Sequence, residues 1–96
     1  MKIIFAFTIV TKKMFGGLAF MVHGKMLATA SGRDGVMVMV RIGKERQDAL
    51  LPASGASVTV MKGIPQKGYV DLDEEGVKAL SFWIKEAIAF NDELMT

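Results

Sequence analysis

Two apolar runs separated by a pair of turn-forming residues constrain this sequence more than any other feature. One run covers residues 14–22, the second begins at Lys25, and His23-Gly24 lies between them. A two-residue hairpin loop needs positive φ angles, which glycine adopts freely and histidine tolerates better than most residues. Pairing across that loop places Phe20 opposite Leu27. The sequence therefore predicts a β-hairpin whose first strand covers the whole first run.

The first ten residues resemble a signal peptide only superficially. Lys2 precedes a short apolar stretch, but no small-x-small cleavage site follows it. The stretch is much shorter than the roughly twenty residues that a membrane-spanning helix needs. β-Branched residues and two phenylalanines dominate it, so it favours a strand. We expect one domain over residues 1–96, located in the cytoplasm and without a membrane partner.

Another predicted strand, over residues 36–42, is apolar on both sides. Valines and an isoleucine occupy one face, and the other face carries Met37, Met39 and Arg41. A strand of this kind is typical of a position where both sides of the sheet are covered. A domain this small has few helices. We therefore expect a partner subunit to cover the second face.

The remaining patterns predict two helices and two more strands. A short helix is expected over residues 44–51, stopped by Pro52, and strands are expected over residues 57–61 and 67–72. Asp71–Glu74 has the form of a capping box. Apolar residues at helical spacing follow it as far as Phe90 or Asn91. Together the elements predict an α+β fold with two layers, an antiparallel β-sheet of about five strands with two or three helices packed on one face.

Charge is unevenly placed along the chain, although the net charge is only +2. Residues 1–70 carry ten Lys/Arg and three Asp/Glu, whereas residues 71–96 carry two Lys and seven Asp/Glu. Such asymmetry can steer a partner or draw two segments of one chain together. We favour the second explanation, because an acidic helix often packs beside a basic sheet edge.

No group of residues predicts catalysis or cofactor binding. The sequence has no cysteine, which excludes disulfides, thiol catalysis and thiolate metal sites. His23 is the only histidine, and a lone histidine makes no zinc site. Gly16-Gly17 lacks a Walker or dinucleotide pattern and is better explained by a bulge or a close backbone approach in a strand. A helix cap explains the acidic residues Asp71, Asp73, Glu74 and Glu75, which could otherwise hold a hard cation. We expect no enzyme activity, no cofactor and no metal.

The hairpin is part of a longer pattern that resembles a known family. Residues 14–26 read Met-Phe-Gly-Gly-Leu-Ala-Phe-Met-Val-His-Gly-Lys-Met, and the likeness continues over residues 38–46, 63–70 and 80–90. This pattern is similar to the signature of the TfoX N-terminal domain family, named after a regulator of bacterial competence. The residues that carry the structural signature are Met14, Phe15, Gly16, Gly17, His23, Gly24, Gly68 and Trp83.

The resemblance implies a two-layer α+β domain similar to secretion-chaperone-like folds. Family members usually carry an amphipathic helix before the signature, where this chain has a strand-like segment. They usually have Asn-Gly at the turn, where this chain has His23-Gly24. The full-length competence regulators also have a second, C-terminal domain. We expect this chain to be a small stand-alone member without it, so their regulatory activity is not carried over.

Three functions follow from these patterns. The first is a non-enzymatic protein-interaction or regulatory module that forms a homodimer through its sheet, with interface candidates Met37, Met39, Arg41, Phe5 and Phe7. The second is a regulatory domain associated with nucleic acid or competence control, suggested by the family name and the basic first seventy residues. The third is a small-ligand binder or an enzyme of unknown type.

Overall fold

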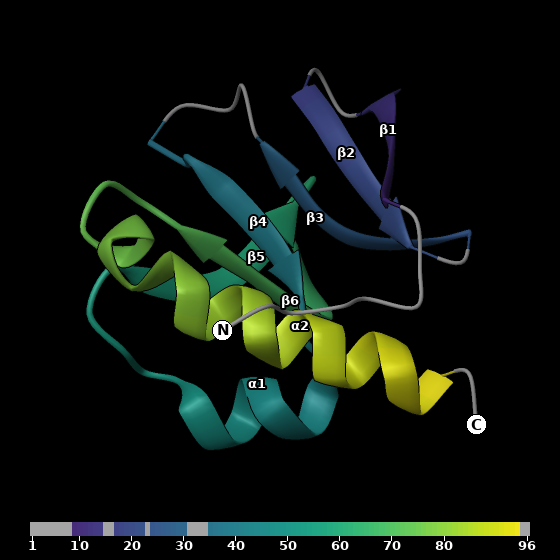
Figure 1. Cartoon of the computed structure of the whole chain (residues 1–96). Coiled ribbons are helices and arrows are strands. Elements are labelled where there is room, and N and C mark those ends of the chain that lie inside the picture. The colour runs from purple at the N-terminus through teal and green to yellow at the C-terminus, as the bar shows by residue number, and fades with distance from the viewer. Residues whose placement is uncertain (1–8, 15–16, 23, 31–34, 95–96) are drawn as a thin grey trace.

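The computed structural model describes residues 9–14, 17–22, 24–30 and 35–94 as one antiparallel sheet with helices against it (Figure 1). The elements in chain order are β1 (Ile9–Met14), β2 (Gly17–Val22), β3 (Lys25–Ala30), β4 (Val38–Arg41), α1 (Lys44–Leu50), β5 (Ala56–Met61), β6 (Ile64–Leu72), the 3₁₀ helix η1 (Gly76–Ala79) and α2 (Leu80–Leu94). The strand order across the sheet is β1-β2-β3-β4-β6-β5. The predicted α+β class is confirmed, with six described strands in place of about five.

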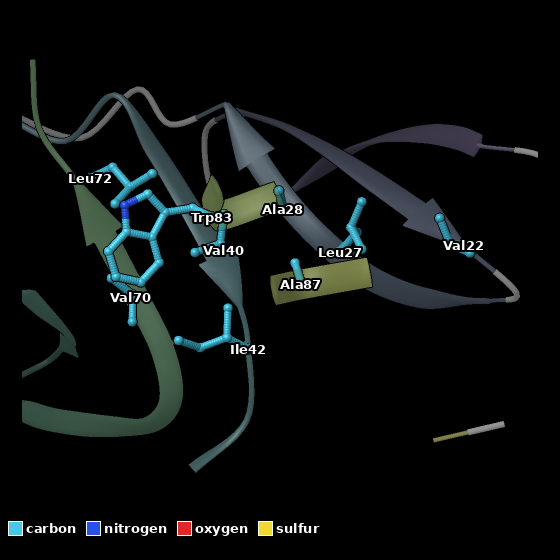
Figure 2. Close-up of a cluster of buried hydrophobic side chains, with 9 residues drawn as sticks. All are labelled: Val22, Leu27, Ala28, Val40, Ile42, Val70, Leu72, Trp83 and Ala87. Atoms are coloured by element: carbon cyan, nitrogen blue, oxygen red, sulfur yellow. The ribbon is translucent and has the colours of Figure 1, made fainter. Parts of the chain in front are cut away.

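The main core lies between the sheet and α2. Trp83 and Ala87 point from the helix toward the sheet, where Val40, Val70 and Leu72 are fully buried (Figure 2). Trp83 and Ala87 are four residues apart, which places them on the same helix face. Burying one large aliphatic or aromatic side chain stabilises a fold by about 1.5–3 kcal/mol. This stripe of the helix therefore holds α2 against the central strands.

Residues 14–22 form parts of two strands, so the prediction of one continuous strand is wrong. β1 ends at Met14 and pairs antiparallel with β2, in which Gly17 is the partner of Met14. Only residues 15–16 separate the two strands. Gly17 is therefore the first residue of β2, whereas the sequence interpretation placed it inside a longer strand. The predicted strand over residues 1–8 lies outside the described residues.

The second hairpin keeps its predicted turn but shifts its register. Val22 pairs with Lys25 and Met21 with Met26, as expected. Beyond them Phe20 pairs with Ala28, so β3 contains one more residue than β2 over this interval. That residue is Leu27, and the shift is a β-bulge. The bulge explains why Leu27 and Ala28, which are neighbours in sequence, both belong to the buried core.

The C-terminal helical segment begins at a different acid from the one predicted. Asp71 belongs to β6, and its Oδ1 accepts a hydrogen bond of 2.8 Å from the hydroxyl of Thr59. Asp73 is the cap, since its Oδ1 accepts hydrogen bonds from the amides of Glu75 at 2.8 Å and Gly76 at 3.0 Å. The first acid of the predicted capping pattern, Asp71, is thus paired in strand β6, and the second, Asp73, caps the helical segment. The helix then continues to Leu94, beyond its predicted end.

The centre of the sheet face opposite the helices is also buried within this single chain. Met39 is only 1 % exposed, and Thr59 and Asp71 are buried beside it on neighbouring strands. β6 bends here, because its residues 66–69 lie opposite the single β5 residue Thr59. The centre of this face therefore needs no partner subunit to cover it, contrary to the expectation for Met39.

Gly76 makes a close backbone contact that sets where the helical segment starts. A Cβ atom on Gly76 would overlap the carbonyl of Gly55, and one on Gly55 would overlap the amide of Gly76. The amide of Asp73 donates a 2.9 Å hydrogen bond to the same Gly55 carbonyl. The backbone just before β5, at Gly55, thus packs directly against the backbone at the start of η1, at Gly76, and no side chain fits between them.

Replacing Gly76 by alanine should therefore destabilise the fold, although alanine is the better helix former. We expect Gly76→Ala to lower the free energy of unfolding by about 1–3 kcal/mol, the usual cost of overpacking. Urea denaturation followed by circular dichroism measures it. Ser81→Ala is the matched control, since it introduces alanine at an exposed helix position and should change stability by less than about 0.5 kcal/mol. Equal effects of the two changes would contradict the packing argument.

Candidate functional site

A pocket of about 240 Å³ opens on the sheet face opposite α2. Its lining comes from four strands and consists of Met26, Met39, Met61, Gln66 and Tyr69. Methionine side chains are flexible and polarizable, so such a lining adapts to apolar surfaces of different shape. None of these five side chains is a carboxylate, a histidine, a cysteine or a lysine. The pocket is therefore suited to apolar contact and offers no acid–base pair for catalysis.

Arg41 lies between two aromatic rings. Its guanidinium carbon is 6.0 Å from the ring centroid of Tyr69 and 5.4 Å from that of Phe90. A guanidinium at such distances is attracted by the electron-rich ring faces. Arg41, a predicted interface residue, is thus engaged within its own chain, where it joins β4 to β6 and α2.

Arg46 connects the two helices through charge. Its Nε donates to Glu86 and its Nη1 to Glu93, both at 3.1 Å. The hydrogen bond from Arg46 lowers the pKa of the Glu93 carboxyl below its ordinary value. Because that pKa is lower in the folded chain, the pair adds stability at neutral pH and loses it as the pH falls through the acid range. The basic and acidic parts of the sequence meet here, although the basic side chain lies on helix α1 and not on the expected sheet edge.

Gly43 and Gly68 approach each other closely, just before α1 begins. The carbonyl of Gly68 accepts hydrogen bonds from the amides of Ile42 at 2.9 Å and Gly43 at 3.1 Å. A Cβ on Gly68 would lie 3.2 Å from the Cα of Gly43, and both glycines have positive φ. A Cβ on Gly43 would instead strike the ring of Phe90 at 2.5 Å. The signature residue Gly68 therefore serves backbone geometry.

The other signature residues have structural places where they are described. Trp83 is buried in the core, and Gly24 has φ 76° in the turn after β2. Met14 ends β1 and Gly17 begins β2. Phe15, Gly16 and His23 lie outside the described residues, as do the interface candidates Phe5 and Phe7.

Exposed apolar side chains gather on the β5–β6 hairpin. Val58 is 37 % exposed, Val60 49 % and Ile64 62 %. β5 forms one edge of the described sheet, with β6 as its neighbour. The sequence interpretation missed this surface. Its signal is the absence of Asp, Glu, Lys and Arg from residues 49–61, which leaves the edge strand without charge.

The two methionines predicted for an interface lie in opposite environments. Met37 is 50 % exposed, whereas Met39 is buried. Met39 therefore cannot contact a partner unless the chain opens around it. Met37 is accessible just before β4, and its role in an interface stays a prediction.

A matched pair of substitutions checks this placement. We expect Met39→Glu to lower the free energy of unfolding by at least about 3 kcal/mol, because it buries a charge and removes packing. Met37→Glu should change it by less than about 0.5 kcal/mol, as surface substitutions usually do. Thermal or urea unfolding of both variants gives the comparison. A stable Met39→Glu variant would mean that the face is open in solution.

Two further features of the described residues concern metal ions and membranes. They contain no group of three or more His, Cys, Asp or Glu side chains arranged to hold a metal ion. Among their helices, none combines the length and the apolar character needed to cross a membrane.

Comparison with known proteins agrees with the signature. The family model of the TfoX N-terminal domain matches residues 6–91. Neither the curated proteins nor the solved structures contain a significant match to the chain. The matched region includes every described strand, α1 and most of α2. The chain belongs to the TfoX N-terminal domain family.

Proposed function

We propose that this protein is a non-enzymatic interaction module that forms a homodimer through its sheet. The observation that carries the proposal is the set of exposed apolar side chains on the β5–β6 hairpin, with Val58 and Val60 on one face and Ile64, the partner of Met61, on the other. Side chains of this kind, grouped on one hairpin next to an open sheet edge, are typical of surfaces that meet another chain. Family membership is consistent with a regulatory role for such a contact.

The side chains that line the pocket favour a role in protein interaction over enzyme activity. Its lining of methionine, tyrosine and glutamine provides neither a nucleophile paired with a base nor a pair of carboxylates. Enzyme activity of unknown type, or binding of a small apolar ligand at this pocket, is therefore the weaker proposal. The helix face of the central strands is already occupied by α2, which leaves the sheet edges and the hairpin as the surface for a partner.

Association with nucleic acid has less support from the described residues. Arg46 pairs with Glu86 and Glu93, Lys44 with Asp48, and Lys78 with Glu75. Side chains paired with acids in this way do not form the continuous basic surface that phosphate binding uses. Binding of duplex DNA at low salt in a fluorescence-anisotropy titration would favour this alternative over the dimer.

Light scattering coupled to size exclusion tests the proposal directly. We expect a mass of twice the 10.5 kDa of one chain at micromolar concentration. The mass should persist in high salt, because apolar contacts are not screened as exposed ion pairs are. A mass of one chain at every concentration up to the millimolar range would contradict the proposal.

A further inference from the structure

We infer that β5 (Ala56–Met61) pairs antiparallel with β5 of a second copy, so that two six-stranded sheets join into one continuous sheet. The inference rests on the proposed homodimer and names the part of the sheet that forms it. It departs from the predicted interface at Met37 and Met39. Three properties of β5 support this pairing: its place in the sheet, its lack of charge and its exposed valines.

The place of β5 in the sheet gives it a free side. The strand order ends β4-β6-β5, so among the described strands β5 has β6 as its neighbour on one side only. The backbone of an edge strand offers unpaired N–H and C=O groups, which are a template for pairing with another strand. β5 is also rich in residues with high strand propensity, since Val58, Thr59 and Val60 are consecutive β-branched residues.

The charge pattern indicates that the partner strand is a second copy of this chain. A two-fold axis places the same segment of both copies side by side, and like charges directly opposite each other destabilise a strand pair. β5 contains no Asp, Glu, Lys or Arg, so it meets this requirement. The opposite edge strand of the described sheet, β1, has the sequence IVTKKM, and its two lysines give a self-pair of this strand a like-charge cost that β5 does not have. Of the two edges, only β5 is therefore compatible with its own copy.

The side chains of β5 fit the same arrangement. Thr59 points inward, where its hydroxyl donates to Asp71, and it is fully buried. Val58 and Val60, on either side of it, remain exposed. Val58 pairs with the core residue Val70 and is itself partly exposed, so it lies at the border of the hydrophobic core. A second β5 would place its own valines beside these and extend that core across the dimer axis.

Paired charge variants test the arrangement. Two double variants are made, Val58→Lys with Val60→Lys, and Val58→Glu with Val60→Glu. Each places like charges on both copies near the axis, so each alone should raise the dissociation constant of the dimer by at least about tenfold. Mixing the two variants in equal amounts should restore a dimer, because Lys then faces Glu. Light scattering gives the masses, and far-UV circular dichroism checks that each variant is folded.

A control variant and the wild type separate this inference from the proposal beneath it. Met37→Lys adds charge at a residue of similar exposure outside β5 and should leave the dimer intact. A wild-type chain that is monomeric at all concentrations overturns both the dimer and the pairing, and leaves the edge to a strand from a different protein. If the wild type is a dimer and both double variants are dimers as well, the β5 pairing is wrong although the dimer is real. The same holds if Met37→Lys is the only variant that becomes monomeric. Folded double variants that stay monomeric when mixed also overturn it.

Discussion

The side-chain amide of Gln47 holds together the part of this fold on which the rest depends. Its Nε2 donates to the carbonyls of Gln66 at 3.0 Å and Tyr69 at 2.9 Å, at the two ends of the β6 bulge. Gln47 is the buried residue of α1, so this contact decides where the short helix lies. A buried carbonyl left without a partner costs about 1–3 kcal/mol. One side chain therefore stabilises both the bend in β6 and the position of α1.

The rest of the architecture follows from that bend. With α1 held on β6, Gly43 meets Gly68 in backbone contact, and Arg46 reaches the acids of α2. The bulge lies beside Thr59 of the neighbouring strand β5. The hydroxyl of Thr59 donates a hydrogen bond to Asp71 on the sheet face opposite α2, where Met39 is also buried. A chain of this size thus covers the centre of both faces of its sheet. The β5 edge is the surface that we propose for a partner.

The sequence predicted elements wherever a local signal determined them. Pro52 ended α1 near the expected residue, and His23-Gly24 placed the turn between Val22 and Lys25. Asp71 misled the helix prediction, because a capping pattern does not reveal that a strand continues through its first acid. Residues 66–69 carry no periodic signal for a bulge. The β5 surface was missed because its signal is a lack of charged residues. Chemistry was sought in charged residues, which β5 does not contain.

Unfolding of Gln47→Met measures the central contact most directly. Methionine keeps the length of the side chain and removes the donor. Two carbonyls then lose their partner, and the free energy of unfolding should fall by about 2–4 kcal/mol. Gln66→Met is the control, since its amide donates to the exposed carbonyl of Ile64 at 2.9 Å, and a change below about 0.5 kcal/mol is expected. Equal stability of the two variants in urea denaturation would contradict the role given to Gln47.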